Sequence, residues 1–364
     1  MIGDFEEIAI ERGERSGVTM AVAVHSTVLG PALGGARMWH YADDDSAVAD
    51  AMRLAEAMTH KASAAGLELG GGKGVIATPA EARPEGELRR AILLDFGDLV
   101  ASLEGRYVTA EDVGTGDEDM AVIAERTPNV VGLRSDRGGS GDPSPVTALG
   151  VRAAMRACAE ARWGSSELRG RRVVLIGYGH VGSHLARMLV ADGAELLVTD
   201  VASDRRRAAA ELGAGWVEPG SALGTECDVL APCALGGIVD RTSIPRLQCG
   251  VLCGSANNIL AEEEDAERLA ERGVIYAPDF IANAGGLMSV YGELLGTAHD
   301  DALRMAAGIE GTVGAILAEA QRRGITPLAA ARRRSVARLR AASATRRPRS
   351  GAGAEPAGVR LRNS

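Results

Sequence analysis

Apolar and polar positions along the N-terminal part of the chain predict strands, helices and breaks in turn. The run VTMAVAVHS at 18–26 is dense in apolar residues and predicts a strand. It follows a polar lead-in at 4–17 and precedes LGPALGGARMW at 29–39, where proline and glycines break regular structure. Residues 46–59 repeat apolar positions with the 3.6-residue period of an amphipathic helix. Residues 87–103 predict a second helix.

A linker then separates this part from a regular alternation of strands and helices. A short strand at 107–109 is followed by RSDRGGSGDPSP at 134–145, whose composition marks a linker and a domain boundary. A helix is predicted at 146–161 and helical segments again at 300–323. Between them lie apolar runs of strand length, at 173–176, 227–237, 250–258 and 273–280. Strands that alternate with helices predict a parallel, doubly wound sheet.

Composition limits the class of protein. The chain has 364 residues, 46% of them hydrophobic, so two domains with sizeable cores are expected. The net charge of −9 argues against nucleic acid as a partner. There is no apolar run long enough to span a bilayer and no secretory signal pattern, which favours a cytoplasmic protein. Five cysteines without zinc-ribbon spacing fit a reducing compartment, and no metal site is expected.

The two lysines of the chain are its most informative residues. Lys and Arg together number 40, yet only Lys61 and Lys73 are lysines. An amine can lose its proton when buried whereas a guanidinium cannot, so we expect at least one of them to titrate in a reaction. Gly70, Gly71 and Gly72 directly precede Lys73 and predict a glycine loop that a ligand approaches closely. A tight turn with two ordinary surface lysines is the alternative.

Two acids follow the predicted strand at 107–109. Glu111 and Asp112 lie just past its end, and strand ends of open α/β sheets are where ligands bind. Adjacent acids in a loop are often merely solvated. Because the two lysines need an anionic partner, we predict a functional role for Asp112.

A glycine fingerprint follows the strand at 173–176. Gly177, Gly179 and Gly182 form G-x-G-x-x-G ahead of a predicted helix, and Asp200 ends the next strand. In this context the glycines allow a tight turn, close approach of a pyrophosphate and close packing of the helix. The intervening residues of the turn are Tyr178, His180 and Val181. Asp200 would bond the ribose hydroxyls of NAD and repel the 2′-phosphate of NADP, although the arginines at 205–207 could accept such a phosphate.

These patterns together predict an α/β protein of two domains. An N-terminal α/β substrate domain would occupy 1–135, and a Rossmann, doubly wound NAD-binding domain 142–323, with a cleft between them. A C-terminal helix at about 324–342 would pack back on the first domain. The Arg-, Ala- and Ser-rich remainder, 343–364, is expected to be a basic disordered tail.

Several motifs in one order resemble a known family. The chain is similar to the amino-acid dehydrogenases of the glutamate/leucine/phenylalanine/valine type, most of all to the leucine and valine branch. The resemblance runs from about Thr19 to about Arg333. It is carried by LGPALGGARMW, MTHKASAAGLELGGGKGVI, TAEDVGT, GDPSPVTALG, GYGHVG, APCALGG, GSANN and YAPDFIANAGG.

The resemblance implies a role for each matching residue. Lys61 would grip the substrate α-carboxylate, Lys73 would activate water, and Asp112 would exchange the proton of the amino group. Gly34 would contact the same carboxylate through its main chain. Three further positions fall where the family contacts the nicotinamide or the substrate: Asn258, Asn283 and Thr147. The implied reaction is a reversible, NAD-dependent oxidative deamination of an L-amino acid to a 2-oxo acid and ammonia.

The resemblance also bears on the side chain of the amino acid. Glutamate dehydrogenases hold the side-chain carboxylate with an additional lysine at the position of Leu33, and this chain has no third lysine. An apolar Leu33 should face an apolar side chain. Ala110, Leu287 and Val290 match the other pocket positions, and the size of Leu287 favours valine, leucine or isoleucine over an aromatic amino acid. A small pocket difference discriminates only modestly.

Two alternatives remain open from the sequence. One is a dehydrogenase of an aromatic amino acid, phenylalanine or tryptophan. The other is a non-catalytic NAD-binding regulator on the same fold, against which the set of Lys61, Lys73 and Asp112 speaks. The expected partners are small molecules only, without nucleic acid or membrane, and the family's habit predicts a homo-oligomer.

Overall fold

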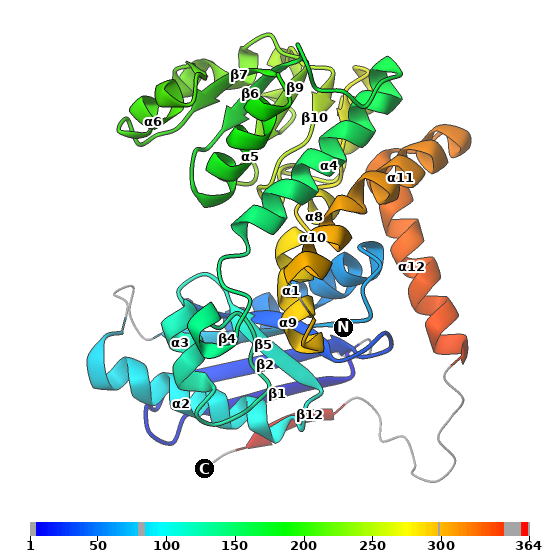
Figure 1. Cartoon of the computed structure of the whole chain (residues 1–364). Coiled ribbons are helices and arrows are strands. Elements are labelled where there is room, and N and C mark those ends of the chain that lie inside the picture. The colour runs from blue at the N-terminus through cyan, green and yellow to red at the C-terminus, as the bar shows by residue number, and fades with distance from the viewer. Residues whose placement is uncertain (1–4, 79–83, 298, 346–357, 363–364) are drawn as a thin grey trace. The chain divides into compact units, whose positions relative to one another are not determined.

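The computed structural model describes residues 5–78, 84–297, 299–345 and the backbone of 358–362. The chain forms two compact units (Figure 1). Unit 1 comprises Met1–Asp142, Glu293–Gly296 and Ser335–Ser364. Unit 2 comprises Pro143–Gly292 and Thr297–Arg334, so the first division falls within the segment at 134–145 that the composition marked as a linker. None of the described helices is long and apolar enough to cross a membrane.

Unit 1 is built on a mixed six-stranded sheet of order β12-β1-β2-β4-β3-β5. Its strands are β1 (Glu7–Arg12), β2 (Thr19–Ser26), β3 (Ala32–His40), β4 (Gly70–Thr78), β5 (Tyr107–Glu111) and β12 (Gly358–Arg362). Its helices are α1 (Asp44–Ala64), α2 (Gly86–Ser102) and α3 (Asp117–Ile123), with a 3-10 turn η2 at Ser135–Arg137. Strand β3 runs parallel to both β4 and β5, whereas β2 is antiparallel to β1 and β4.

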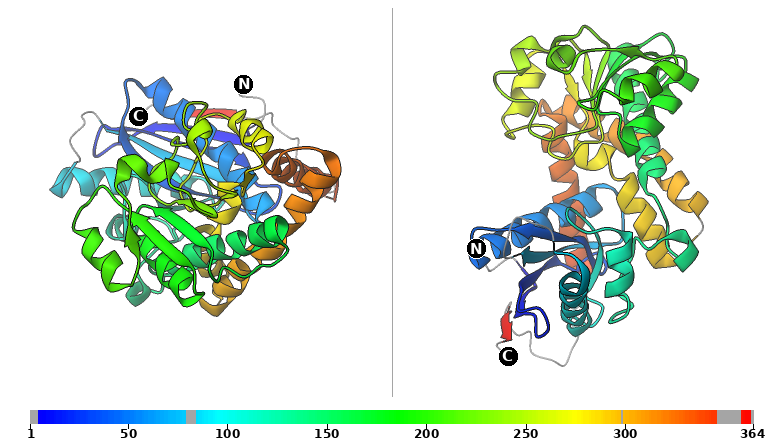
Figure 2. Two further views of the ribbon diagram at one scale, coloured as in Figure 1. Left: turned by 90° about the horizontal axis from the view of Figure 1, so that it is seen from above. Right: turned by 90° about the vertical axis from the view of Figure 1, so that its left-hand side faces the viewer.

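Helices cover both faces of this sheet (Figure 2). Each face has its own apolar core. Val22 and Ile76 pack with the apolar residues of α2 and α3. Ala23 and Val75, next to them in the chain, pack with the alanines of α1. Because side chains alternate along a strand, Lys73 lies on the α1 face with Val75.

Strands β1 and β3 correct the sequence analysis. The segment described as a polar lead-in contains β1, in which Ile8 and Ala9 are buried. Its charged residues masked the strand, because Glu7 is itself buried and pairs with Arg106. The segment LGPALGGARMW does not break regular structure, since β3 runs through Gly34 and Gly35.

The triple glycine is also not a loop. Gly70, Gly71 and Gly72 are the first three residues of β4, and all three are buried. A Cβ on Gly70 would lie 1.9 Å from the carbonyl oxygen of Ser26, and one on Gly71 would lie 2.1 Å from the amide nitrogen of Thr59. Here the glycines serve the close packing of β4 against its neighbours, and the prediction that they form a loop is wrong.

Unit 2 contains an all-parallel sheet of order β11-β10-β9-β6-β7-β8. Its strands are β6 (Arg172–Ile176), β7 (Glu195–Thr199), β8 (Gly215–Trp216), β9 (Val229–Pro232), β10 (Val251–Leu252) and β11 (Ile275–Tyr276). Its helices are α4 (Ser144–Trp163), α5 (His180–Ala191), α6 (Arg205–Glu211), α7 (Asp265–Glu271), α8 (Asp279–Ala282), α9 (Gly285–Leu295), α10 (His299–Ala307) and α11 (Ile309–Arg323). Two 3-10 turns complete it, η3 (Pro219–Gly224) and η4 (Ile244–Arg246). The prediction of a doubly wound α/β fold is confirmed, and β6 lies between β7 and β9 at the point where the strand order reverses.

The C-terminal part of the chain differs from the expected disordered tail over 343–364. Helix α12 (Pro327–Thr345) continues to Thr345, and β12 pairs with β1 in parallel. Residues 346–357 and 363–364 lie outside the described residues. From Ser335 onward the helix belongs to unit 1, where the Ser335 hydroxyl lies 3.0 Å from Nδ1 of His60. The five residues of β12 are too few for a periodic pattern to be recognised within the Arg-, Ala- and Ser-rich remainder, so this strand was not predicted.

Candidate active site

Lys73 and Asp112 lie together in unit 1. Lys73 extends from the middle of β4, and its side chain is 6% exposed. Asp112 directly follows β5, and its Oδ2 lies 2.8 Å from Nζ of Lys73. Strand β3 separates β4 from β5 in the sheet, and the two residues meet across its middle, since Ala36 pairs with Gly74 on one side and with Glu111 on the other. The structure thus places the predicted amine and the predicted acid in one ion pair.

The environment shifts the pKa values of both partners. Burial lowers the pKa of Lys73 below that of an ordinary lysine, and the charge of Arg37 acts in the same direction, while Asp112 opposes them. Burial works to raise the pKa of Asp112, but Lys73 and Arg37 outweigh it and hold that pKa below its usual value. The pair therefore combines an amine that loses its proton more easily than usual with an acid that remains ionised.

Arg37 is a member of this site that the sequence analysis missed. Its Nε lies 2.9 Å from Oδ2 of Asp112, and its Nη1 lies 3.0 Å from Oδ2 of Asp50 on α1. Residues 33, 35 and 37 share one face of a strand, so recognising β3 would have placed Arg37 beside the sheet face of Lys73. The segment was interpreted as a break, and that signal was lost.

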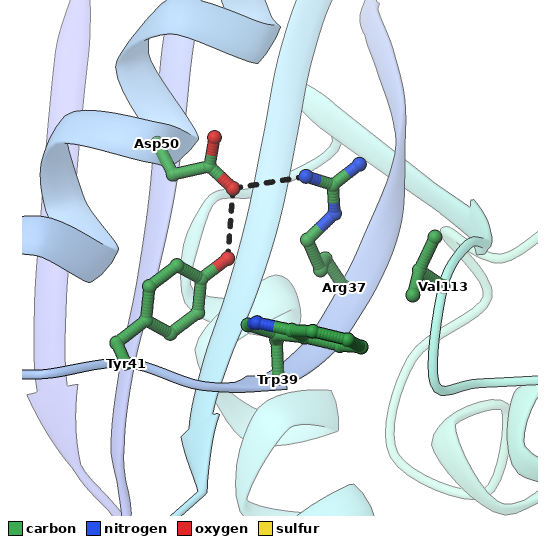
Figure 3. A pocket seen from close by; sticks show the side chains of 5 residues that line it. All are labelled: Arg37, Trp39, Tyr41, Asp50 and Val113. Carbon is green, nitrogen blue, oxygen red and sulfur yellow. Dashed lines mark hydrogen bonds and ion pairs between the residues drawn. The ribbon is translucent and has the colours of Figure 1, made fainter. Parts of the chain in front are cut away.

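A pocket of about 480 Å³ opens beside Arg37. Figure 3 shows its lining residues, which are Arg37, Trp39, Tyr41, Asp50 and Val113. The Tyr41 hydroxyl donates a hydrogen bond of 2.8 Å to Oδ2 of Asp50, the same oxygen that Arg37 contacts. Arg53 binds the other oxygen of Asp50 at 2.6 Å. A chain of polar contacts thus extends from Lys73 to this pocket.

The other predicted substrate residues of unit 1 lie on neighbouring elements. Lys61 is half-buried in the last turn of α1. Gly34 lies so close to β4 that a Cβ there would be 1.8 Å from the carbonyl oxygen of Gly72. Leu33 is 2% exposed on β3, and Ala110 is 7% exposed on β5.

The glycine fingerprint of unit 2 forms the turn between β6 and α5. Gly177 has φ of +106°, a conformation that favours glycine, and a Cβ on Gly182 would lie 2.1 Å from the carbonyl oxygen of Gly177. Gly179 is the exposed N-cap of α5, and a Cβ there would meet nothing within 4 Å. Asp200 follows β7, and its Oδ2 accepts a hydrogen bond of 2.6 Å from the amide of Tyr178. His180 and Val181 begin α5.

The remaining predicted residues of unit 2 cluster around α8 and the starts of α4 and α9. The Asn283 amide donates to Oδ1 of Asn257 at 2.9 Å and to the carbonyl of Ser255 at 3.2 Å. Asn258 has a positive φ of +51°. Thr147 lies in the first turns of α4, where a Cβ on Gly285 would be 2.7 Å from its Cα. Leu287 and Val290 lie on α9, with Leu287 buried.

Models of protein families match both parts of the chain. The model described as Glu/Leu/Phe/Val dehydrogenase, dimerisation domain, matches residues 6–129. The model described as Glutamate/Leucine/Phenylalanine/Valine dehydrogenase matches residues 198–347. A third model, D-isomer specific 2-hydroxyacid dehydrogenase, NAD binding domain, matches residues 149–235, which include the glycine fingerprint.

Individual relatives are similar over almost the whole chain. A leucine dehydrogenase of Thermoactinomyces intermedius is 43% identical over 344 residues, which cover 94% of this chain and 93% of the relative. A valine dehydrogenase of Streptomyces albus is 44% identical over 348 residues, 94% of each chain. Among solved structures, L-tryptophan dehydrogenase from Nostoc punctiforme aligns with a TM-score of 0.83 at 35% identity, covering 94% of this chain and 98% of that one.

The fold, the Lys73–Asp112 pair and these matches define the class of protein as an oxidoreductase, an amino-acid dehydrogenase with a Rossmann unit. The chain belongs to the Glu/Leu/Phe/Val dehydrogenase family. The resemblance noted from its motifs is thereby confirmed.

Proposed function

We propose that this protein oxidises a branched-chain L-amino acid, namely valine, leucine or isoleucine, to its 2-oxo acid and ammonia with NAD, and catalyses the reverse reaction. The observation that carries the proposal is Leu33, which is buried at 2% exposure on the strand that also carries Gly34. An amino-acid side chain directed at an apolar Leu33 must itself be apolar, because an unpaired carboxylate there would be strongly disfavoured. Relatives named leucine and valine dehydrogenases support this substrate class.

The residues around the glycine fingerprint fit NAD. The open space at Gly179 and the N-terminus of α5 suit a pyrophosphate, and Asp200 is held beside the turn by the Tyr178 amide. Arg206 binds Glu218 and Arg207 binds Glu211, so these two arginines are engaged away from a 2′-phosphate. When bound, NAD would accept the hydride from Cα of the amino acid. We assign Thr147 and Asn258 to contacts with its nicotinamide.

The proton transfers are assigned to the pair in unit 1. Loss of hydride leaves an iminium carbon, which water must attack. Lys73, in its neutral form, would take the proton from that water, and Asp112 would exchange protons with the amino group that leaves as ammonia. Lys61 and the main chain of Gly34 would hold the α-carboxylate.

Four further residues are assigned to the substrate. Asn283 would bind it through its amide, and Ala110, Leu287 and Val290 would line the space for its side chain. The family domain at 6–129 is described as a dimerisation domain, and we propose that the protein forms a homo-oligomer.

An aromatic amino acid is the second candidate substrate. It is favoured by the similarity to a tryptophan dehydrogenase over 94% of this chain. Leu287 is a large residue for a pocket position, and its size argues for a branched side chain over the larger side chain of an aromatic amino acid. A non-catalytic regulator is no longer favoured, because the chain belongs to a family of oxidoreductases and keeps the Lys73–Asp112 pair.

The test is NADH formation at alkaline pH with L-valine, L-leucine, L-phenylalanine, L-tryptophan and L-glutamate, with NADP in parallel. We expect kcat/KM for valine or leucine to exceed that for glutamate by at least about 10²-fold, because an unpaired buried carboxylate costs about 3–5 kcal/mol. Turnover of aromatic amino acids alone would support the second candidate and overturn the assignment of the pocket.

The choice of cofactor predicts the effect of Asp200→Ser. Without the carboxylate, the repulsion of a 2′-phosphate disappears while the turn loses its bond to the Tyr178 amide. We expect the ratio of kcat/KM for NADP to that for NAD to rise by about 10- to 10²-fold. Asp192→Asn, at the other end of α5, removes a charge bound to Arg152 and is the control. An unchanged cofactor ratio in Asp200→Ser would remove Asp200 from the cofactor site.

A further inference from the structure

We propose that Arg37 is a positioning residue that fixes the orientation of the Asp112 carboxylate relative to Lys73, and that Asp50 and Tyr41 hold Arg37 for this purpose. The proposal rests on the proton-transfer roles proposed above for Lys73 and Asp112. It means that the contacts among Arg37, Asp50 and Tyr41 affect the rate of the reaction, in addition to stabilising the surface beside the pocket.

The first observation is that two cations share one atom. Nζ of Lys73 and Nε of Arg37 both lie against Oδ2 of Asp112, at 2.8 and 2.9 Å. Neither contact uses Oδ1. With Oδ2 held in this way, Oδ1 is the oxygen that can meet the amino group of a substrate. A partial turn of the carboxylate about its Cβ–Cγ bond would move Oδ2 away from both cations and break both contacts.

The second observation is that Arg37 is itself anchored on its other side. Its Nε and Nη1 point in different directions within the rigid guanidinium plane, so one side chain connects Asp112 with Asp50. Asp50 is fixed in turn by the Tyr41 hydroxyl on one oxygen and by Arg53 on the other. A lysine at position 37 would have one nitrogen in place of these two, so it could not keep both carboxylates at their present positions.

Arg37 affects the Lys73–Asp112 pair through its charge as well as through its contacts. The groups that interact electrostatically with the pair are Arg37 on β3, Asp50 on α1 and Tyr107 on β5. The positive charge of Arg37 lowers the pKa of Lys73, whereas the negative charge of Asp50 raises it. Removing Arg37 should therefore raise the pKa of Lys73, and removing the charge of Asp50 should lower it. A cluster that only stabilised the fold would not move this pKa in opposite directions.

The pocket beside Arg37 makes a chemical test available. Its volume is about 480 Å³ and Asp50 lines it, so a small guanidinium ion can reach the position that Arg37 occupies. In Arg37→Ala, added guanidinium should occupy the space between Asp112 and Asp50 and restore part of the lost turnover.

The experiment compares Arg37→Lys, Arg37→Ala, Asp50→Asn and Tyr41→Phe with wild-type enzyme, measuring kcat and KM for the amino acid, pH profiles and melting temperature. Arg89→Lys is the matched control, because Arg89 makes two contacts with Asp119 in the same unit and its side chain has the same 22% exposure. We expect Arg37→Lys to lower kcat by about 10²-fold, as misplacement by about 1 Å can do, with KM changed only a few-fold. Arg89→Lys should leave kcat near that of wild type.

The pH profiles and the rescue decide between positioning and a purely structural role. The acid limb of kcat/KM should move to higher pH in Arg37→Ala and to lower pH in Asp50→Asn, and guanidinium should raise kcat only in Arg37→Ala. The proposal would be overturned if kcat fell equally in Arg37→Lys and Arg89→Lys and the fall followed the loss of melting temperature. In that case the pH profiles would not shift and guanidinium would not restore turnover. Wild-type turnover in Lys73→Met would instead overturn the proposed roles of Lys73 and Asp112, so the two failures are distinguishable.

Discussion

Replacing Lys73 by methionine is expected to lower kcat for oxidative deamination by about 10²- to 10⁴-fold, the range that a positioned general base contributes. Methionine keeps the length and the apolar stem of the side chain but has no proton acceptor of comparable basicity. Because the side chain of Lys73 is only 6% exposed, water is a poor substitute for its amine at this position. The measurement is steady-state NADH formation across pH, with NADH binding followed by fluorescence.

Two variants separate the loss of a base from the loss of a charge or of the fold. Lys73→Arg keeps the positive charge but cannot give up its proton, so its kcat should fall as far as that of Lys73→Met while NADH still binds. Asp119→Asn removes the charge of a carboxylate that is 12% exposed and bound to Arg89. This variant should lower the melting temperature without the fall in kcat expected for Lys73→Met. Near-normal turnover in Lys73→Arg would show that Lys73 is not the base.

The sequence was most informative where function depends on a residue type at a fixed spacing. The two lysines, Asp112 and the glycine fingerprint could be recognised because chemistry or backbone conformation restricts the residue at each position. Arg37 could not, since its role depends on where Asp50 and Asp112 meet in space. The site was thus predicted as a set of reactive groups, without the residues that hold them.

The missed parts of the fold have a common physical cause. Strand β1 contains charged residues such as Glu7, β3 contains two glycines and β4 begins with three, and glycine has low strand propensity. Strands β8 and β12 are short, with two and five residues. In each case contacts with distant parts of the chain determine the strand. The periodicity of one sequence carries no information about those contacts.

Replacing Gly34 by alanine should destabilise unit 1 by more than ~3 kcal/mol, at or above the upper end of typical overpacking costs. The added Cβ would lie 1.8 Å from the carbonyl oxygen of Gly72, so two hydrogen-bonded strands would have to separate. The Tyr107 hydroxyl also donates a 2.6 Å hydrogen bond to the carbonyl of Gly34, and that contact would move with the strand. Chemical denaturation of the purified variant, or loss of soluble protein, measures the effect.

A graded series of glycine variants tests whether packing explains these residues. In Gly72→Ala the new Cβ would meet the ring of Tyr107 at 2.6 Å, and a side chain can shift where a backbone cannot, so the loss should be smaller than in Gly34→Ala. Gly311→Ala, in α11 with nothing within 4 Å, should stabilise by about 0.5–1 kcal/mol. If Gly34→Ala instead kept wild-type stability and only raised KM for the amino acid, the glycine would be there for the substrate carboxylate, and the packing account of this strand pair would be wrong.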